Sequence, residues 1–462
     1  MFMNRWWKFA QRAVPPEVIA LIRLLKEHGL TAYLVGGAPR DLLLSKVPTD
    51  WDLATDALPE TVEEICAEHS EEGLKVIQVG KKFGTIKLLK SGLVIEVTTF
   101  RQEGPYSDGR HPDWVDFRPR IEEDLSRRDF TVNAMALEVF SKQLIDPFGG
   151  REDLKHKVIR AVGDPEQRFA EDALRMLRFF RFQSGLGFRG DRKTEKAITP
   201  HLLKKISPER IREEVTKLLV SSRPVQGLSG LIRTGLLLSF APEFAGVVSD
   251  ERLISHILMT VETITPHPSL RWAALLHDLG KAQCRIVDER GLHYYGHAEV
   301  GAELARNLLE RLRFSKDFIK RVTILVRWHM FSADPNQTDA ALRRLALRVG
   351  EENLCDLLEL RRADIIASGQ NYHRAWERFS AFASRIEALL QAEKVLTLQD
   401  LAVNGEDIMK VLGIPAGPQV GRILQELFAW ITEEPDRNNR EDLYQYLEEH
   451  YLSGSSRLEA EN

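Results

Sequence analysis

The sequence predicts an α+β protein, in which an N-terminal domain with a mixed sheet is followed by all-α domains. Within the first 150 residues, short β-like runs at residues 32–35, 84–89 and 93–100 occur among helical patterns. Beyond Arg151 the strand signals almost vanish, and apolar residues recur with the 3.6-residue period of helices. A chain of 462 residues is also longer than one hydrophobic core usually serves, so we expect several domains.

Composition places the chain among ordinary globular proteins. Hydrophobic residues make up 43% and charged residues 29%, which argues against a disordered or fibrous protein. No apolar run is long enough to span a membrane, and Arg5, Lys8 and Arg12 interrupt the N-terminal stretch before a signal-like run can form. The three cysteines are far apart and support neither a disulfide framework nor a cysteine metal site. We expect a cytoplasmic protein without a membrane partner, and its oligomeric state stays open.

The charge is small overall but uneven. A net charge of −4 argues against nonspecific nucleic-acid binding over the whole surface, because such binding depends on neutralising phosphates. From Glu171 to Lys217, however, twelve Lys and Arg stand against seven Asp and Glu. This basic middle suits a confined nucleic-acid or nucleotide surface, although a solvated helical face is the commoner cause of such a run.

The N-terminal α+β region contains the first motif whose residue types suggest catalysis. An amphipathic helix is predicted at residues 16–28; a buried-looking strand then runs into Gly36 and Gly37, a helix follows, and Asp50-x-Asp52 comes next. Adjacent glycines let backbone N–H groups approach a phosphate. If the two aspartates lie on a strand, both carboxylates point to one face, where they can hold Mg²⁺. A Gly-Gly alone is usually a turn and an Asp-x-Asp usually a loop, but together in this order they indicate phosphoryl or nucleotidyl transfer.

Two helices are predicted in the basic middle. In AEDALRMLRFFRFQ (170–183), polar residues recur at every third position and form a stripe: Asp172, Arg175, Arg178 and Arg181. In SPERIREEVTKLLV (207–220), Ser207 is expected to cap the helix that Pro208 begins. A histidine-rich helical block follows at 249–370, and a final one at 396–451 contains the turn GIPAGPQVG.

These segments resemble class II tRNA nucleotidyltransferases, the CCA-adding members of the DNA polymerase β superfamily, whose motif G-G-x-x-R-D is followed by D-x-D. Further matches follow in the family's order, namely EDLSRRDFTVNAMAL (123–137), LIDPFGGREDL (144–154), EDALRMLRFFRF (171–182) and SPERIREE (207–214). The similarity spans nearly all of residues 30–220. Pro39 departs from the branched apolar residue common in the family, which bears on where the local helix starts.

The resemblance implies a polymerase β-like head that uses Mg²⁺, CTP and ATP to extend tRNA. Asp50 and Asp52 would be the catalytic metal ligands, and Glu96 is a candidate third acidic group near them. Asp172 would accept a hydrogen bond from a base amino group while Arg175 donates to ring acceptors, a pattern that cytosine and adenine share and that uracil and guanine reverse. The nucleotide-binding residues that it implies are Gly36, Gly37, Arg40, Arg128, Asp129, Asn133, Asp172, Arg175, Arg178 and Arg181.

A second resemblance, to HD-domain metal phosphohydrolases, rests on LRWAALLHDLGKA. The implied ligands of a divalent transition metal are His256, His277, Asp278, His297, His329 and Asp364. Such a metal with an open position would activate water for phosphatase or cyclic phosphodiesterase chemistry on RNA ends. The alternative is an HD domain that is purely architectural.

The expected domains are a nucleotidyltransferase head (1–150), a helical neck with the base-selecting helix and tRNA contacts (151–245), the HD domain (246–370) and a tRNA-binding helical tail (371–462). The function predicted is template-independent addition or repair of the 3′-terminal CCA of tRNA. The polar segment QEGPYSDGRHPDWVDFRPRI (102–121) is predicted to be a mobile loop, which could act as a lever when the enzyme switches from C to A. Its presence favours a complete CCA-adding or an A-adding enzyme, because family members that stop after CC resemble a version with this loop shortened. The sequence also leaves open a CC-adding specialist, a bacterial poly(A) polymerase, an HD hydrolase with a nucleotide-sensing head, and a non-catalytic tRNA-binding protein.

Overall fold

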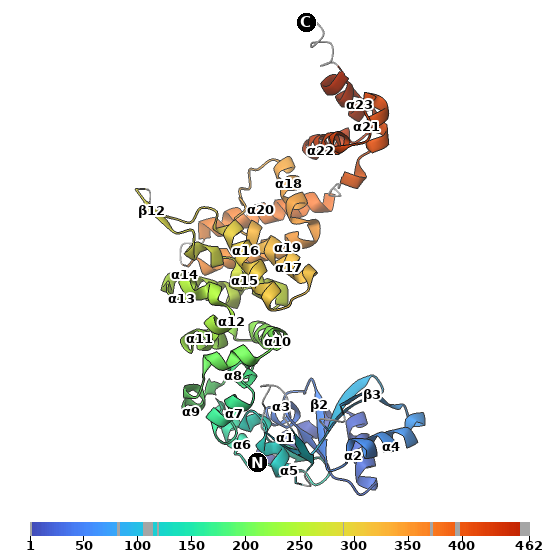
Figure 1. Ribbon diagram of the computed structural model, residues 1–462, viewed down its shortest axis with the longest axis vertical. Coiled ribbons are helices and arrows are strands. Elements are labelled where there is room, and N and C mark those ends of the chain that lie inside the picture. Colours follow the sequence, from blue (N-terminus) through green and yellow to red (C-terminus); the bar gives the residue numbers. More distant parts are fainter. Residues whose placement is uncertain are drawn as a thin grey trace. The chain divides into compact units, whose positions relative to one another are not determined.

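The protein divides into two compact units in a computed structural model that describes residues 2–80, 84–104, 114–117, 120–289, 291–369, 373–392 and 398–452. The first unit comprises Met1–Ala245 with Arg311–Phe314, and the second comprises Gly246–Glu310 with Ser315–Asn462 (Figure 1). The finer division into four domains stays a prediction. None of the described helices is long and apolar enough to cross a membrane.

The head of the first unit is built on a mixed sheet, as predicted. Its described strands run in the order β3 (Leu74–Gly80), β4 (Thr85–Lys90), β5 (Leu93–Thr99), β2 (Trp51–Thr55), β1 (Ala32–Val35), β8 (Ala136–Glu138) and β9 (Gln143–Ile145). Strand β2 lies antiparallel to β1 and parallel to β5. The three predicted β-like runs became β1, β4 and β5. Strands β8 and β9 went unpredicted because three residues are too few to show an alternating pattern.

Helices on one face of this sheet bury the larger core of the head: α1 (Phe2–Ala13), α2 (Pro16–Glu27), α3 (Gly37–Leu43) and α4 (Pro59–Glu68). Trp51 and Leu53 of β2 belong to that core, whereas Ala54 packs on the opposite face with α5 (Ile121–Ser126). Successive strand residues alternate between faces, so Asp52 shares the face of Ala54. Pro39 is buried in the first turn of α3, where proline is tolerated, and the helix begins at Gly37 regardless.

The rest of the first unit is largely helical. Its described helices are α6 (Gly150–His156), α7 (Pro165–Glu171), α8 (Leu174–Leu186), α9 (Arg192–Lys196), α10 (Pro208–Leu219), α11 (Pro224–Arg233) and α12 (Leu236–Phe240). Helix α8 packs against α10 and α11. Two glycines of α11 allow the close approach to α8: a Cβ at Gly227 would lie 2.2 Å from Ser184 Oγ, and one at Gly230 would lie 2.2 Å from the ring of Phe180.

Two local predictions in this region were wrong. The helix predicted at 170–183 is broken at Asp172, which is extended (φ −141°, ψ 101°) between α7 and α8. The Asp172 carboxylate accepts a hydrogen bond from Leu174 N at 3.1 Å, and this local bond competes with helix continuation. Helix α10 begins at Pro208 as expected, but the Ser207 side chain makes no capping hydrogen bond.

The second unit contains helices α14 (Glu251–Thr263), α15 (Pro268–Leu276), α16 (His297–Arg311), α17 (Lys316–Trp328), α18 (Asp339–Val349), α19 (Glu351–Ala367) and α20 (His373–Ala392). A short hairpin of β12 (Ile286–Asp288) and β13 (Gly291–His293) corrects the prediction that this block is entirely helical. Both strands are only three residues long and largely exposed, so their apolar pattern is weak.

The chain continues in the second unit as α21 (Gly405–Leu412), α22 (Pro418–Glu433) and α23 (Arg440–Leu447), which share a core of their own. The predicted turn separates α21 from α22. Gly413 ends the first of these in a left-handed conformation, and Gly417 precedes the second.

Candidate functional site

The predicted head aspartates lie at the start of β2 beside a third carboxylate. Asp52 is the register partner of Val35 on β1 and of Glu96 on β5, and Asp50 immediately precedes the strand. Partners in register point to the same face, so Asp52 and Glu96 share it. Lys87 Nζ lies 3.6 Å from Glu96 Oε2, so its positive charge partly offsets the negative charge of Glu96. Glu96, the candidate third acidic group, therefore lies directly beside Asp52.

The electrostatics of Asp52 fit a cation site. Burial, the neighbouring Glu96 and, to a smaller extent, Asp50 raise its pKa to about 6, against the opposing effect of Arg128. The side chain is thus held where its own charge is unfavourable. Carboxylate oxygens are what Mg²⁺ prefers, and a divalent ion would relieve the repulsion between Asp50, Asp52 and Glu96. The residues present fit the ion that the resemblance implies.

Gly36 lets the main chain pass close to Asp52 and Arg128. Its φ of +70° and ψ of −126° lie in a region that other residues rarely adopt. A Cβ there would lie 2.9 Å from Asp52 Oδ2 and 3.5 Å from Arg128 Nη1. Arg128 is itself anchored, because its Nη2 donates to Asp124 Oδ2 at 2.9 Å.

We expect Gly36→Ala to lower nucleotide transfer by roughly a hundredfold, since a shift of about 1 Å in a reacting group has that effect. The cause would be displacement of Asp52. Gly73→Ala is the matched control, because Gly73 also has positive φ (+78°) but nothing within 4 Å of the Cβ position. Its cost is expected to be confined to stability, at about 1 kcal/mol. Equal losses of turnover in the two purified variants would contradict the assignment.

Four of the predicted nucleotide-binding residues form one hydrogen-bonded chain. Arg40 Nη1 donates to Asn133 Oδ1 at 2.7 Å, and Asn133 Nδ2 donates to Asp129 Oδ1 at 3.1 Å. Arg178 donates to Asp129 Oδ2 through Nε at 2.8 Å and Nη2 at 2.6 Å. Burial would raise the pKa of Asp129, but Arg178 and Asn133 outweigh it and lower the pKa to about 2. Asp129 is therefore an ionised anchor that joins the head to α8.

Three guanidinium groups surround the buried ring of Phe182. Arg40, Arg178 and Arg181 lie 5.5, 5.3 and 4.1 Å from its centroid. Gly37 packs beneath this group, since a Cβ at Gly37 would lie 3.2 Å from Arg40 Nη2. Such a concentration of planar cations suits a polyphosphate.

The predicted base-selecting pair is engaged with protein groups. Asp172 Oδ2 accepts from Arg210 Nη2 at 2.7 Å. Arg175 is buried and donates to the carbonyl oxygen of Arg127 at 2.9 Å and to Glu171 Oε2 at 2.8 Å. Reading a base would require these side chains to exchange partners, so their role stays a prediction.

Sequence reasoning left two charged residues of α10 without a role. Arg210 holds Asp172, and Glu214 lies 2.6 Å from Arg181 Nε and 3.5 Å from Arg178 Nη1. Both belong to the motif SPERIREE. A spacing of four residues puts them on one face of a helix, which is the signal that would have found them.

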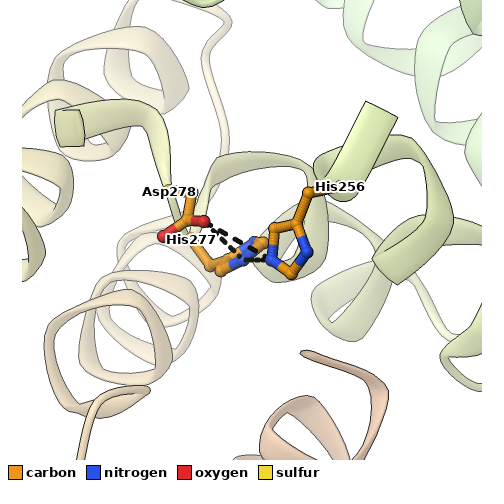
Figure 2. Close-up of side chains that lie close together, drawn as sticks. All are labelled: His256, His277 and Asp278. Carbon is orange, nitrogen blue, oxygen red and sulfur yellow. Dashed lines mark hydrogen bonds and ion pairs between the residues drawn. The ribbon is translucent and has the colours of Figure 1, made fainter. Parts of the chain in front are cut away.

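The predicted HD residues converge in the second unit from five segments of chain: His256, His277, Asp278, His297, His329 and Asp364. Figure 2 shows His256 and His277 directed toward Asp278, with the two ring nitrogens 3.3 Å apart. Asp364 Oδ1 lies 3.0 Å from His256 Nε2. Burial would raise the pKa of Asp278, but His277 and its other partners hold the pKa well below the ordinary value. Imidazole and carboxylate donors at this separation fit a divalent transition metal.

The predicted mobile loop at 102–121 lies mostly outside the described residues, which leave out 105–113 and 118–119. At its described ends, β6 (Arg101–Glu103) pairs with β7 (Val115–Phe117), and Gly104 N donates to Trp114 O at 2.9 Å. The loop therefore closes on a short hairpin.

Three family models match successive parts of the chain. The "Poly A polymerase head domain" matches residues 32–160. The "Probable RNA and SrmB-binding site of polymerase A" matches residues 187–247, and a model for tRNA nucleotidyltransferase domain 2 matches residues 296–447.

Similarity over nearly the whole chain is found to CCA-adding enzymes. The CCA-adding enzyme of Geobacillus stearothermophilus is 36% identical over 450 residues, which cover 94% of this chain and 97% of that protein. The CCA-adding enzyme of Geobacillus sp. (strain WCH70) is 34% identical over 436 residues, covering 93% and 96%. Among solved structures, the Bacillus stearothermophilus CCA-adding enzyme in complex with CTP matches with a TM-score of 0.74 and 31% identity, over 96% of this chain and all of that one.

Proposed function

The chain belongs to the family of CCA-adding enzymes, and from this premise we propose that its first unit builds the 3′-terminal CCA of tRNA from CTP and ATP. The observation that carries the proposal is the acidic face of the head sheet. Asp52 and Glu96 lie there in register, Asp50 immediately precedes the strand of Asp52, and Arg128 is close enough to lower the pKa of Asp52. This arrangement supports nucleotidyl transfer over a purely sensing or RNA-binding head.

In this proposal Asp50 and Asp52 hold Mg²⁺, with Glu96 beside them. The bound ions would activate the tRNA 3′-hydroxyl and stabilise the pyrophosphate leaving group. Arg128 and Arg40 receive the triphosphate, and the Asp129 anchor keeps Arg178 close to the same cluster. Because these cations are held by fixed carboxylates and amides, little reorganisation is needed as charge develops.

Base choice is assigned to Asp172 and Arg175, after exchange of their present partners. Asp172 would leave Arg210 to accept from the base amino group, and Arg175 would leave Glu171 to donate to the ring. Charge-assisted hydrogen bonds of this kind contribute about 1.5–3 kcal/mol each. The proposal thus makes α10 part of the selecting apparatus, since Arg210 holds Asp172 when no base is bound.

We expect Asp172→Ala combined with Arg175→Ala to let UTP and GTP enter, with a larger effect on base choice than on the rate of transfer. Incorporation of each nucleotide into tRNA lacking its terminus measures both. The control is Glu195→Ala with Arg233→Ala, which removes a partly exposed ion pair (2.6 Å) of the same unit. If the variant with both changes at Asp172 and Arg175 still selects C and A, these two residues do not choose the base.

The overall activity is tested by giving the purified protein tRNA that lacks its terminus, with CTP and ATP supplied separately and together. A complete enzyme adds two C residues with CTP alone and CCA with both. Addition of C residues only, or of A only to tRNA ending in CC, would identify a specialist. Long runs of A would identify a poly(A) polymerase.

A second activity is proposed for the second unit, because its six predicted ligands converge in a largely buried cluster. Such a centre would supply an activated water for hydrolysis of phosphate monoesters or cyclic phosphates at RNA ends. Lys281 Nζ donates to Asp278 Oδ2 at 2.6 Å and adds positive charge beside the cluster, which suits an anionic substrate.

We expect His277→Ala combined with Asp278→Ala to abolish this phosphohydrolase activity and leave nucleotide addition within about twofold, since the two sites belong to different compact units. The measurement is release of phosphate from 2′-, 3′- and cyclic phosphates across several divalent metals. Inactivity of the unaltered protein with every metal would favour an architectural role.

A further inference from the structure

Two adjoining cavities lie beside the His-Asp cluster of the second unit. The first has a volume of about 560 Å³ and is lined by His297 of that cluster, and the second has a volume of about 590 Å³. Both are within the roughly 300–1,000 Å³ that is usual for ligand sites. Arg327, Trp328 and Arg348 line both cavities, so these side chains form a common wall. The second cavity therefore extends the first one away from the cluster.

The second cavity is strongly basic. Three of its cations, Lys316, Lys320 and Arg327, are spaced by four and eleven residues, which puts them on one face of α17. The others come from two further helices, so a solvated face of a single helix does not explain the set. The cationic side chains of its lining are Arg306 of α16, Lys316, Lys320 and Arg327 of α17, and Arg348 of α18, against one carboxylate, Glu310.

These five cations lack close carboxylate partners. Arg306 approaches Glu303 only to 3.7 Å, and its buried Nε has no hydrogen-bond partner among the described residues. None of the other four forms an ion pair with an acidic side chain in the same part of the chain. Cations gathered in this way repel one another and attract an anion. The local excess occurs in a protein whose net charge is −4, which makes it a feature of this site.

The first cavity adds aromatic surface next to the cluster. Tyr295 is 63% exposed and stacks on His293, with ring centroids 5.2 Å apart and ring planes 13° from parallel. Trp328 carries the guanidinium of Arg348 over its ring at 5.8 Å. Aromatic rings stack on bases, and arginines and lysines bind phosphates. The first cavity thus suits a nucleotide, and the second suits further phosphates.

We propose that the two cavities bind the end of a single RNA strand. The terminal nucleotide lies in the first cavity with its phosphate at His297, and the phosphates of the preceding nucleotides lie among the cations of the second. The proposal rests on the hydrolase proposed above and names the form of its substrate, which is a strand and not a free mononucleotide. A mononucleotide fills only the first cavity and gains nothing from Lys316 and Lys320.

The first test measures hydrolysis of oligouridylates that end in a 2′,3′-cyclic phosphate and contain one to six nucleotides. The oxygen of one water bonds to phosphorus, one ribose P–O bond breaks, and the freed ribose oxygen takes the proton, so no other reactant is needed. We expect kcat/KM to rise at least about tenfold with length and then level off, and to fall with salt for the longer strands, because bound phosphates release counterions.

Lys316→Gln combined with Lys320→Gln should remove most of this length effect. It is expected to lower kcat/KM for the hexanucleotide about tenfold, to flatten its logarithmic salt dependence by about 1.4, and to leave the mononucleotide within about twofold. Both lysines are exposed, so the variant should fold. Arg252→Gln with Lys410→Gln is the matched control, because both side chains are exposed, line neither cavity and carry the same charge.

The second test locates the strand without relying on hydrolysis. A hexauridylate with 4-thiouridine at its cyclic-phosphate end is irradiated with the full-length chain in EDTA, and the attached peptide is identified by mass spectrometry. Attachment at Tyr295 or Trp328 is expected, and it should weaken in the variant at Lys316 and Lys320 but not in the control.

The outcomes separate this proposal from the hydrolase. Equal kcat/KM for one and six nucleotides, unaffected by the change at Lys316 and Lys320, would overturn strand binding and leave the hydrolase standing. Attachment at Tyr295 or Trp328 in a chain that hydrolyses nothing with any metal would support strand binding and overturn the hydrolase. A chain that shows neither a length effect nor attachment in these cavities would overturn strand binding.

Discussion

Asp52→Asn is expected to abolish transfer from both CTP and ATP, by at least roughly a thousandfold, or about 4 kcal/mol in transition-state stabilisation. The change removes the charge of a carboxylate that we propose binds Mg²⁺ on the acidic face of the head, and it keeps the shape of the side chain. Steady-state incorporation into tRNA measures it, and tRNA affinity should remain within about twofold because no phosphate contact is lost.

Asp56→Asn is the control for this change, since Asp56 follows the same strand and accepts a hydrogen bond from Thr31 N at 2.8 Å. It is expected to keep its activity. Loss of C addition with retention of A addition in Asp52→Asn would contradict a single active site for both nucleotides.

The same substitution should stabilise the metal-free protein. The folded-state pKa of Asp52 is about 6, above the ordinary value of 3.8, so ionisation costs folding free energy above pH 6. The cost disappears as the pH falls through 6 toward 4. Asp52→Asn should therefore gain up to about 3 kcal/mol at pH 8 and almost nothing at pH 4, measured by denaturant unfolding with EDTA. An equal gain in the free energy of unfolding at both pH values would show that ionisation of Asp52 does not destabilise the folded protein.

Asp129→Ala is expected to destabilise the first unit by about 1.5–3 kcal/mol, because it removes a buried carboxylate that accepts two charge-assisted hydrogen bonds from the partly buried Arg178. The folded pKa of about 2 lies below the ordinary 3.8, so the contribution of Asp129 is complete above pH 4 and is lost as the pH falls toward 2. The deficit of the variant should shrink over that interval.

A double-mutant cycle isolates this interaction. Asp129→Asn, Arg178→Met and their combination should show a coupling free energy of at least about 1 kcal/mol. Removing the partly exposed Glu195–Arg233 pair should cost about 0.5 kcal/mol or less after screening by solvent. Additive effects of the two changes at Asp129 and Arg178 would mean that the pair does not anchor α8 to the head.

Much of the architecture was readable from local pattern. Strands β4 and β5 and helix α2 fall where alternation or helical period indicated, because each buries one face more than the other, and β1 was found as a short apolar run because both of its faces are buried. The unpredicted strands β8 and β9 are too short to carry a period. The break at Asp172 was also missed, since apolar spacing continues across it while the Asp172 side chain bonds to the backbone of Leu174.

For the candidate sites, residue types and spacing were enough to nominate Asp50, Asp52 and the six residues of the His-Asp cluster, since acidic pairs and His-Asp motifs are recognisable along the chain. Only the fold decided which groups meet. Parallel register brought Glu96 beside Asp52. Close packing of α8 and α10 brought Arg210 within hydrogen-bonding distance of Asp172. Burial raised the pKa of one aspartate and Arg178 lowered that of another. Partner, distance and solvent exposure depend on residues far apart in sequence, so pairing and protonation are properties of the tertiary structure and not of the local sequence.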